Sequence, residues 1–454
     1  MMFALSELVA PLAAELRGDD LRFAEVTTDS RGIANDALFV ALKGDRFDGH
    51  SFVAQAHAAG AVAALVSEFV DVALPQVKVT DTLAALQQMA AQWRSRFGIP
   101  VVAVTGSNGK TTTKQMLASV FAARGPVLAT QGNLNNHIGV PLTLLRLRSE
   151  HRTAVIEMGA NHAGEIALLA SIARPNVGVV TQAGDAHLEG FGSRAGVAKA
   201  KGELFAALGA DGVAVINADD EYFSLWKDLA GDASVLSFGL RDGVDVQALH
   251  LEPQPGTGSR FTLVTPQGRA ELLLPMPGRH NVMNALAAAG CGVALGMEPA
   301  QIAIGISRSE VASGRLNWKQ TTQGARLLDD SYNANPSSLR AGLELLAQLP
   351  GRRWLVLGNM AELGSAAAQL HADAGSTAKR LGIERLFAVG PFAGEAVSAF
   401  GDGAERFDDN EHLAVALAPQ LDRTITLLVK GSRSARMERV VSVLTGESSH
   451  GGTH

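Results

Sequence analysis

The chain has 454 residues, a formal net charge of -6 and 47% apolar residues. This is the composition of a globular protein, so it excludes a disordered or collagen-like chain, and the acidic balance gives no overall basic field for nucleic acid. The single cysteine, Cys291, excludes a disulfide framework and a cysteine-based zinc site. At roughly 100–200 residues per domain, the length suggests three domains.

The N-terminal segment is expected to form an amphipathic helix rather than a signal peptide. No basic segment precedes its apolar residues, and Glu7 interrupts them early. No window reaches 18 uncharged apolar residues, so we expect neither a transmembrane helix nor stable membrane insertion. These features favour a soluble, cytoplasmic protein.

Residues 1–80 are predicted to form a small α/β domain. Short apolar strands are expected over 38–42 and 61–66, with a turn-rich loop over 43–50 and a helix over 51–59 between them. Asp81 can cap the next helix, whose apolar residues recur three or four positions apart as far as Phe97. The first domain boundary is therefore placed near residue 80.

Residues 81–313 alternate short apolar strands with helices. Strands are expected over 100–104, 154–156, 177–180 and 213–216. Such alternation predicts a central domain with a mostly parallel sheet covered on both faces. Residues 233–274 change to alternating strands with Gly and Pro turns, which predicts an antiparallel extension, and an Ala-rich helix is expected over 281–290.

Residues 314–454 are predicted to form a separate doubly wound, Rossmann-like domain. The expected strands are 354–357, 386–389 and 425–429, and the expected helices are 337–349, 366–381, 410–420 and 434–445. Residues 446–454 are expected to be a frayed tail. The predicted fold class is thus α/β with three domains: a small N-terminal domain, a central nucleotide-binding domain and a C-terminal Rossmann-like domain.

A glycine loop between a buried strand and a helix carries the strongest chemical signal. Its residues are Thr105, Gly106, Ser107, Asn108, Gly109, Lys110, Thr111 and Thr112. The glycines let backbone N–H groups face phosphate oxygens, Lys110 can reach the β- and γ-phosphates, and the Thr111 hydroxyl can ligate magnesium. Val104 stands where the strict P-loop pattern has its first glycine, so the alternative is a glycine turn that only caps a helix.

Two polar residues follow other predicted strands, and each has two interpretations. Glu157 ends the strand 154–156, where an acid can bind magnesium near a nucleotide or can be a solvated strand-end group. His187 follows the strand 177–180 and can be a metal ligand or a structural histidine. Both interpretations stay open at this point.

Further polar groups are equally ambiguous. Lys199 and Lys201 lie on a predicted helix and can belong to its solvated face. The polar clusters at 132–137 and 329–336 can grip a sugar or phosphate, or can simply form turns. The residues alone therefore predict a magnesium-dependent nucleotide hydrolase or transferase.

The order of short motifs along nearly the whole chain resembles the Mur ligase family, the ATP-dependent amide ligases of peptidoglycan precursor synthesis. The motifs are Thr28-Asp29-Ser30-Arg31, Asp48-Gly49-His50, the glycine loop, 132–141 (GNLNNHIGVP), 157–161 (EMGAN), 187–189 (HLE), 199–203 (KAKGE), 280–281 (HN), 330–336 (DSYNANP) and 357–364 (LGNMAELG). Each motif is short, but their joint order is specific.

The resemblance implies a two-step reaction with ATP. The substrate carboxylate attacks the γ-phosphate to give an acyl phosphate, and the incoming amine then displaces phosphate. Family members use Mg²⁺, and two ions are expected. The matching metal-binding residues are Thr111, Glu157, His187 and Lys201, with Lys201 carbamylated and Lys199 the less favoured alternative. Lys110, Glu157, His187 and Lys201 match the catalytic residues.

The resemblance also implies the positions that bind each substrate. Asn281 matches the adenine position, and Arg315 and Asp330 match positions near the phosphates and ribose. The UDP-linked substrate is expected at Thr28, Asp29, Ser30, Arg31, Asp48, Gly49, His50, Asn133, Asn135 and Asn136. The incoming peptide is expected at Asn333, Asn335 and the 358–371 segment, including His371, which is equally compatible with a core position. A monomer is expected.

Within the family, the 357–364 segment is typical of the branch that adds D-Ala-D-Ala to UDP-MurNAc-tripeptide. The Asp-Asn-Pro-Arg string of the branch that adds the third amino acid is absent. Many relatives carry Asp where Asn359 stands, which leaves the role of that side chain open. Folylpolyglutamate synthase, a further relative, should lack the 28–50 features.

The alternative from a different functional class is a nucleotide-binding switch without ligase turnover. Retention of Lys110, Glu157, His187 and Lys201 argues against it. The GTPase signature Asn-Lys-x-Asp is absent, so ATP is favoured over GTP. The expected partners are small-molecule substrates and not nucleic acid.

Overall fold

The strands of the residues that the structure describes form three sheets. The computed structural model describes residues 1–44, 47–254 and 258–447. Residues 45–46 of the predicted loop and 448–454 of the predicted tail lie outside this part of the chain. Two compact units are present: the first has residues 1–103, 124–160 and 165–177, and the second has 104–123, 161–164 and 178–454.

The first sheet lies in the first unit and confirms a small N-terminal α/β fold. Its strand order is β1-β5-β4-β3-β2, with β1 antiparallel to β5 and the other neighbours parallel. The strands are β1 (Glu15–Arg17), β2 (Glu25–Thr27), β3 (Ala37–Val40), β4 (Ala61–Val66) and β5 (Gln76–Lys78), and α2 (Val53–Ala58) lies between β3 and β4 in sequence. The expected N-terminal helix is shorter than predicted: α1 covers only Ser6–Val9, because Pro11 follows and cannot extend the helical hydrogen bonds.

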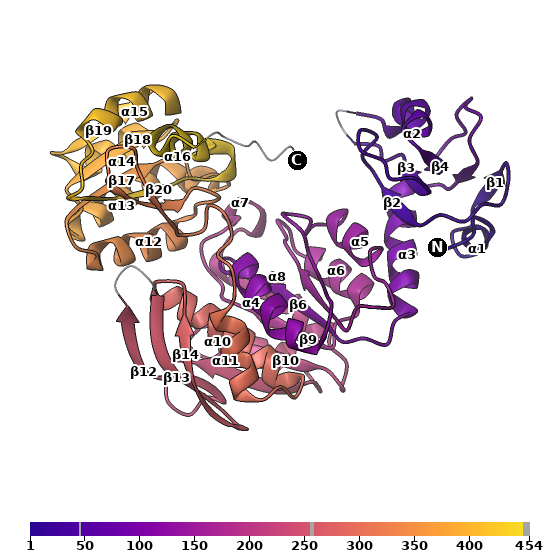
Figure 1. Cartoon of the computed structure of the whole chain (residues 1–454), viewed down its shortest axis with the longest axis horizontal. Coiled ribbons are helices and arrows are strands. Elements are labelled where there is room, and N and C mark those ends of the chain that lie inside the picture. The colour runs from indigo at the N-terminus through magenta and orange to yellow at the C-terminus, as the bar shows by residue number, and fades with distance from the viewer. Residues whose placement is uncertain (45–46, 255–257, 448–454) are drawn as a thin grey trace. The chain divides into compact units, whose positions relative to one another are not determined.

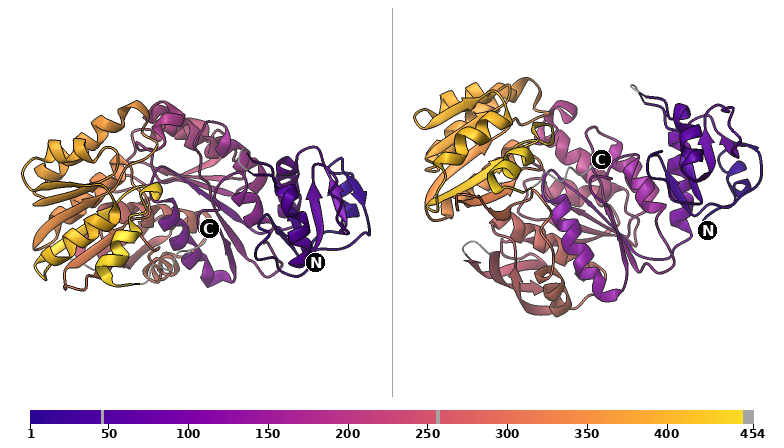
Figure 2. Two further views of the ribbon diagram at one scale, coloured as in Figure 1. Left: turned by 90° about the horizontal axis from the view of Figure 1, so that it is seen from above. Right: turned by 45° about the horizontal axis from the view of Figure 1, so that its top comes forward.

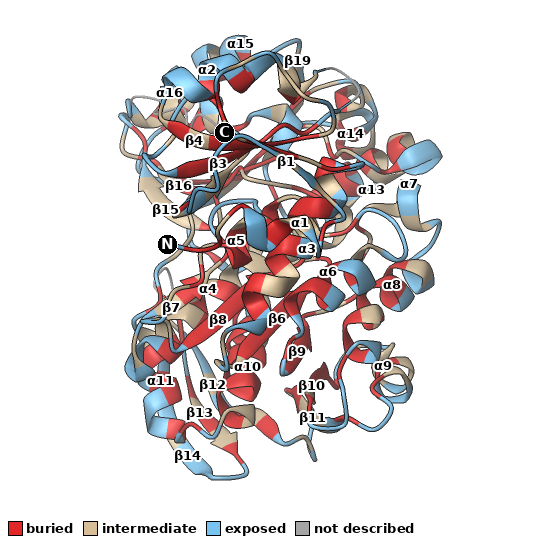
Figure 3. Ribbon diagram, turned by 90° about the vertical axis from the view of Figure 1, so that its right-hand side faces the viewer, coloured by how far each residue is buried: buried red, intermediate tan, exposed pale blue. Residues whose placement is uncertain are grey.

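The strand order β6-β8-β7 also lies in the first unit, except for the last two residues of β6. The strands are β6 (Val101–Thr105), β8 (Thr153–Glu157) and β7 (Val127–Ala129), and every residue of β6 and β8 is buried (Figure 3). Helix α3 (Thr82–Ser95) packs against α5 (Gly139–Leu144) and α6 (Glu165–Ala173). The predicted cap is confirmed, since Asp81 Oδ1 accepts from the backbone N–H groups of Leu83 and Ala84.

The second unit has the strand order β14-β13-β12-β11-β10-β9, except that Val177 of β9 belongs to the first unit. The bounds are β9 (Val177–Val180), β10 (Val213–Asn217), β11 (Ser234–Gly239), β12 (Val246–Gln254), β13 (Gly258–Thr265) and β14 (Gly268–Leu274). The predicted antiparallel extension is confirmed for β12–β14 only, because β11 pairs in parallel with both β10 and β12. The helix α9 (Phe223–Leu229) makes the crossover that a parallel β10–β11 pair requires.

Five further helices of the second unit accompany these strands. They are α4 (Lys110–Phe121), α7 (Leu188–Phe191), α8 (Arg194–Ala206), α10 (Arg279–Ala294) and α11 (Pro299–Ser307). Helices α4, α10 and α11 pack against one another. Glycine permits this closeness, because a Cβ at Gly305 would meet the backbone of Val120. Helix α10 is buried on almost every side, which explains its Ala-rich sequence.

The third sheet has the order β15-β16-β20-β17-β18-β19 and is parallel except for the β15–β16 pair. Its strands are β15 (Asn317–Gln320), β16 (Arg326–Asp330), β17 (Arg352–Leu357), β18 (Arg385–Val389), β19 (Ala404–Phe407) and β20 (Ile425–Lys430). Helices α12 (Pro336–Gln348), α13 (Ala367–Arg380) and α14 (Ala393–Phe400) share one core, and α15 (Asn410–Leu417) and α16 (Glu438–Thr445) share the other (Figures 1 and 2). The predicted Rossmann-like architecture is confirmed.

This arrangement creates a switch point at the carboxyl ends of β17 and β20. The chain leaves β17 toward α13 on one face of the sheet and leaves β20 toward α16 on the other. Ligands of open α/β sheets bind in the crevice that such a divergence leaves. The helix predicted over 434–445 starts later than expected, at Glu438, because residues 433–435 form a 3-10 turn and Arg436 is left-handed, with φ 51°.

Among the helices that the structure describes, none has the length and hydropathy of a membrane span.

Candidate functional site

The glycine loop joins the end of β6 to the first turn of α4. Gly106 and Gly109 have φ of 141° and 82°, which favour glycine. A Cβ at Gly106 would overlap the Thr181 hydroxyl, and one at Gly109 would overlap the side-chain oxygen of Asn284. Both glycines are therefore required by backbone conformation and by close neighbours.

The loop is fastened to the segment that follows β9. The Ser107 N–H donates to the Gln182 carbonyl at 3.0 Å, and the Ser107 hydroxyl exchanges hydrogen bonds with the backbone of Gly184 at 2.8 and 3.1 Å. The Thr181 hydroxyl donates to the Asn108 carbonyl at 2.6 Å. These bonds fix the shape of the loop without a ligand, which is the preorganisation that anion binding needs.

The same loop contacts the N-terminus of α12, which belongs to the third sheet's domain. Asn335 caps this helix by accepting from the Ser338 N–H at 2.8 Å. Its amide nitrogen also donates to Asn108 Oδ1 at 2.8 Å, and Asn108 Nδ2 donates to the Ser337 hydroxyl at 2.9 Å. Helices α4 and α12 thus both begin beside the loop, and the partial positive charge at their N-termini favours anions there.

Several predicted nucleotide-binding residues line two small cavities beside the loop. One cavity, of about 80 Å³, is lined by Asn108, Gly109, Thr112, Asn281, Arg315 and Asp330 together with neighbours from α12 and β20. The other, of about 30 Å³, is lined by Ser107, Asn108, Gly109, Lys110, Thr111, Arg315, Asn333, Asn335 and Ser338. The ammonium of Lys110 donates to the Gly106 carbonyl at 2.7 Å. Thr105 is fully buried at the end of β6.

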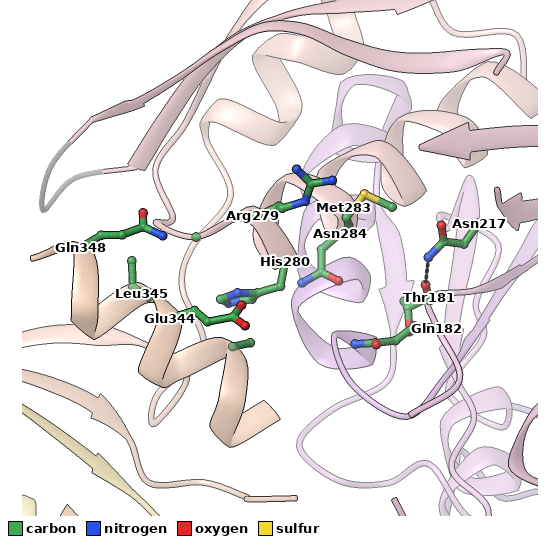
Figure 4. Close-up of a pocket in the computed structure, with 12 residues that line it drawn as sticks. Thr181, Gln182, Asn217, Arg279, His280, Met283, Asn284, Glu344, Leu345 and Gln348 are labelled. Carbon is green, nitrogen blue, oxygen red and sulfur yellow. Dashed lines mark hydrogen bonds between the residues drawn. The ribbon is translucent and has the colours of Figure 1, made fainter. Parts of the chain in front are cut away.

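A cavity of about 300 Å³ lies next to these, between α10 and α12. His280 and Asn284 from α10 and Glu344 from α12 face it, and Asn217 donates to the Thr181 carbonyl at its edge (Figure 4). The predicted adenine residue, Asn281, does not line this larger cavity. Its amide donates to the Pro277 carbonyl at 2.8 Å and its oxygen accepts from Asn284 at 3.1 Å.

The largest cavity of the site, of about 530 Å³, lies where the glycine loop meets the carboxyl ends of β17 and β20. Its lining is mostly polar and consists of Ser107, Lys110, Ala186, His187, Asn333, Ala334, Asn335, Ala361, Glu362, Ser432, Arg433, Ser434 and Arg436. The structure therefore brings together Lys110, His187, Asn333 and Asn335, which come from three distant parts of the sequence.

The ring of His187 contacts a carboxylate within this cavity. His187 has a left-handed backbone, with φ 55°, and its Nδ1 contacts the carboxylate of Glu362, which comes from the loop after β17. The hydrogen bond from His187 lowers the pKa of the Glu362 carboxyl. Glu362 is thus kept ionised and holds the imidazole by its Nδ1 side.

The two lysines of the 199–203 motif have different environments. Lys201 is only 1% exposed on α8, with Nζ 5.2 Å from the ring centroid of Phe191, whereas Lys199 is exposed. The solvated-face interpretation is therefore wrong for Lys201. It does not line the 530 Å³ cavity.

Glu157 lies in the first unit, at the carboxyl end of β8. Its side chain is 2% exposed, and its Oε1 accepts from Asn135 Nδ2 at 2.8 Å. The alternative of a solvated strand-end acid is therefore wrong. In the part of the chain that the structure describes, no three His, Cys, Asp or Glu side chains are grouped so that they alone could hold a metal ion.

The residues predicted for the UDP-linked substrate are in the first unit and make local contacts. The guanidinium of Arg31 donates to both oxygens of Asp29, at 2.9 and 2.7 Å, and this lowers the pKa of Asp29 to about 2. Ser30 beside them is buried, and Thr28 is half-buried.

The remaining predicted UDP-binding residues have structural partners too. Asp48 bonds the His50 Nδ1 at 2.6 Å, and the His50 Nε2 accepts from the Ser67 N–H at 2.8 Å, just after the turn at Gly49. Asn136 Oδ1 accepts from the N–H groups of Ile138 and Gly139 at the start of α5. Asn133 is exposed.

His371 occupies a core position of the third domain. It is 2% exposed, its Nε2 accepts from the Met360 N–H at 3.0 Å, and its Nδ1 donates to the Ala367 carbonyl at 2.7 Å. Burial lowers the pKa of the imidazole. The ring does not line the 530 Å³ cavity, so the structure favours the core interpretation and gives His371 the task of holding the 360–362 loop.

Sequence reasoning missed several residues at the site. Lys430 forms a buried ion pair with Asp330, its partner in the β16–β20 register, and also donates to the Asn333 carbonyl at 3.0 Å. A signal was present, because Lys430 ends an apolar strand just as Glu157 does. Ser337 and Gln182 carry no such signal, since only the fold brings them to the glycine loop.

Three family models match different parts of the chain. Residues 104–292 match the Mur ligase middle domain, 314–433 the Mur ligase glutamate ligase domain and 22–94 the catalytic domain of the Mur ligase family. The chain belongs to the Mur ligase family.

Individual relatives cover nearly the whole chain. UDP-N-acetylmuramoyl-tripeptide–D-alanyl-D-alanine ligase of Escherichia coli is 46% identical over 97% of this chain and 98% of its own length. A crystal structure of MurF from Acinetobacter baumannii is 37% identical, covers 98% of this chain and 99% of its own, and superposes with a TM-score of 0.92. MurF of Thermotoga maritima in complex with ADP is 27% identical over 93% and 97% of the two chains, with a TM-score of 0.82.

The buried His371 predicts an acid-sensitive third domain. Its pKa is below the ordinary value of 6.5 in the folded chain, so unfolding takes up protons as the pH falls below 6.5 and stability is lost. Chemical denaturation of His371→Gln between pH 7 and 5 should show a weaker loss of stability with acid than the parent chain.

His412 provides the matched control, because Asp409 raises its pKa and the sign is opposite. Its stabilising contribution is present at low pH and is lost as pH rises through the folded pKa. The His412→Gln variant should therefore lose stability with acid at least as steeply as the parent chain. Equal pH dependence for His371→Gln and the parent would contradict the structural assignment of His371.

Proposed function

We infer that this chain is the ATP-dependent ligase that joins D-alanyl-D-alanine to UDP-N-acetylmuramoyl-tripeptide in peptidoglycan precursor synthesis. One observation carries the inference: relatives with that activity in their names match the chain from end to end, at up to 46% identity among those described above. The cavity of about 530 Å³ beside the glycine loop supplies room for the reacting groups. The absence of the Asp-Asn-Pro-Arg string agrees with this branch rather than with the one that adds the third amino acid.

The chemistry requires two anions to meet. The tripeptide carboxylate attacks the γ-phosphorus of ATP, the bond to the β–γ bridging oxygen breaks, and ADP leaves with that electron pair. We propose that Lys110, the loop N–H groups and the N-termini of α4 and α12 bind the phosphates and neutralise the charge as the phosphoryl group moves. The dipeptide amine then attacks the acyl phosphate carbonyl and displaces phosphate.

Magnesium is the proposed metal, held by Thr111, Glu157, His187 and Lys201. Two of these residues carry the oxygen atoms that suit magnesium. Glu157 is a buried carboxylate at a strand end, and Thr111 has its hydroxyl in the first turn of α4. When bound, the metal supplies positive charge to the phosphate oxygens. Thr111 and Glu157 provide the oxygen donors that Mg²⁺ prefers, and the two ions expected for the family remain part of the proposal.

The contact between His187 and Glu362 supports the role of His187 as a metal ligand. Metal-binding histidines commonly give their other ring nitrogen to a carboxylate, which fixes the tautomer and orients the ring. With Nδ1 against Glu362, the Nε2 lone pair of His187 is the one available for a metal. Because Glu362 belongs to the third domain, its contact would couple docking of that domain to the metal site.

Lys201 is proposed to be carbamylated. Lys201 is buried on α8, and a buried charged group is stable only where it has a partner. A carbamate bound to a cation has such a partner. A carbamate would give α8 the acidic oxygen donors that its lysine alone lacks.

The other finer assignments are proposals as well. We propose that residues 28–31 and 48–50 and the asparagines of 133–136 bind the UDP-linked substrate, and that Asn333 and Asn335 lie against the dipeptide. Asn281, Arg315 and Asp330 are proposed at the nucleotide, since they line one cavity with Gly109 of the glycine loop. A monomer that works in the cytoplasm, where UDP-linked precursors and ATP are available, completes the proposal.

ADP release tests the function directly. The purified chain is mixed with ATP, Mg²⁺ and UDP-MurNAc-tripeptide, with and without D-Ala-D-Ala, and the product is weighed by mass spectrometry. We expect release that depends on the dipeptide and a UDP-MurNAc-pentapeptide product. Turnover only with UDP-MurNAc-dipeptide and an amino acid would move the chain to the third-residue branch, and ATP binding without any turnover would favour a switch.

The Lys201→Ala variant should lose most ligase activity, and added bicarbonate should not restore it, because no amine remains to be carbamylated. Lys199→Ala is the matched control: it removes the same group from the same helix at an exposed position, and should keep near-normal turnover. Near-normal turnover of Lys201→Ala would refute the proposed role.

The Glu362→Gln variant should need more Mg²⁺ for half-maximal activity, by about 10–100-fold, which is the usual cost of removing a carboxylate behind a metal-binding histidine. Magnesium titration of ADP release measures the shift. Glu384→Gln is the control, since it breaks a surface ion pair with Arg352 in the same domain and should leave the magnesium dependence unchanged. An unchanged magnesium titration for Glu362→Gln would show that the contact between His187 and Glu362 does not affect metal binding.

A further inference from the structure

Three lysine and arginine side chains line the 530 Å³ cavity, and the structure already accounts for two of them. Lys110 belongs to the glycine loop, and Arg433 forms an ion pair with Glu438 at 3.0 Å. The third, Arg436, is exposed toward the cavity, and within the described residues its guanidinium has no carboxylate at ion-pair distance. Beside it in sequence, the hydroxyls of Ser432 and Ser434 lie 3.1 Å apart and also line the cavity.

The segment that carries these groups is held firmly at the switch point of the third sheet. The Gly358 N–H donates to the Lys430 carbonyl and the Ser432 N–H donates to the Asn359 carbonyl, both at 2.8 Å, so the loops after β17 and β20 are joined. A Cβ at Gly358 or Gly431 would overlap the side chain of Met437, which shows how closely the two loops approach.

Arg436 itself has an unusual backbone. Its φ of 51° is in the left-handed region, which non-glycine residues rarely adopt. Asn410 Nδ2 donates to the carbonyls of Ala435 and Arg436, at 2.8 and 3.2 Å, and fixes this turn. A long charged side chain kept in a strained turn on a cavity wall points to a ligand for that side chain.

The reaction supplies a matching ligand. The incoming dipeptide uses its amine to form the new bond, but its terminal carboxylate does not react and brings a negative charge into a cavity that already takes phosphate. A carboxylate is bound best by the planar fork of an arginine, with hydroxyl donors beside it. The apolar part of the lining consists of Ala186, Ala334 and Ala361, whose small side chains leave space for methyl groups.

We propose that Arg436, together with the hydroxyls of Ser432 and Ser434, binds the terminal carboxylate of the incoming dipeptide. This inference rests on the proposed ligase function and names the specificity-determining group of its second substrate. Lys110 and His187 line the same cavity, so a dipeptide held at its carboxyl end by the 432–436 segment keeps its amine within the space where the acyl phosphate forms.

Arg436→Gly is the informative variant, because glycine adopts a φ of 51° without strain and the fold should not suffer. Steady-state kinetics would compare D-Ala-D-Ala with its C-terminal amide, which lacks the carboxylate charge. The parent chain should show a KM for the amide about 10–100-fold above that for the dipeptide, as expected for a hydrogen-bonded charge. In Arg436→Gly, the KM for the dipeptide should rise by a similar factor and the difference between dipeptide and amide should nearly vanish, with the KM for ATP unchanged.

The control is Arg439→Ala, which removes an exposed arginine three residues away that does not line the cavity. It should keep the parent's preference for the dipeptide over the amide. A preference retained by Arg436→Gly would overturn the carboxylate assignment. If the parent chain itself shows no ADP release that depends on D-Ala-D-Ala, the proposed function fails instead, and the two failures are thereby distinguished.

Discussion

The repulsion between like charges is the constraint on which the whole site depends. ATP and the tripeptide carboxylate are anions that must come into contact, and the chain as a whole carries a net charge of -6. Positive charge must therefore be concentrated locally. The fold does this with Lys110, with two helix N-termini that begin beside one loop, and with Arg315 and Lys430 from the neighbouring cavity wall.

This concentration requires parts of two sheets to meet through polar contacts rather than through a shared hydrophobic core. The glycine loop has short side chains, so its shape comes from the segment after β9 on one side and from α12 on the other. The side chain of Asn335 has two roles, because it caps α12 and also donates to Asn108 of the glycine loop. The contacts of Asn108 with Asn335 and Ser337 are polar, so this part of the site is held by directed hydrogen bonds.

The bounds of helices and strands could be predicted from the sequence where neighbouring residues determine where an element begins and ends. The helix over 337–349 and the strand over 425–429 lie within a residue of α12 and β20, because Asn335-Pro336 and the apolar run mark their ends. The hydrogen-bond partners of a single side chain were not accessible in this way. His371 has the residue type of a binding group, yet its two hydrogen bonds lie within the 360–371 segment, and only the packed structure shows that both ring nitrogens are used.

The close approach of the loops after β17 and β20 has a consequence for inhibitor resistance. Gly358 and Gly431 cannot be enlarged without displacing Met437, and the Asp330–Lys430 pair cannot lose one partner without leaving a buried charge. These residues do not line the large cavity themselves, but they hold the loops that carry part of its lining, and they therefore tolerate few substitutions. Escape mutations should instead collect at exposed lining residues such as Ser434 and Arg436, where side chains can change at little cost to folding, and compounds that bind the backbone of these loops should retain their potency longer.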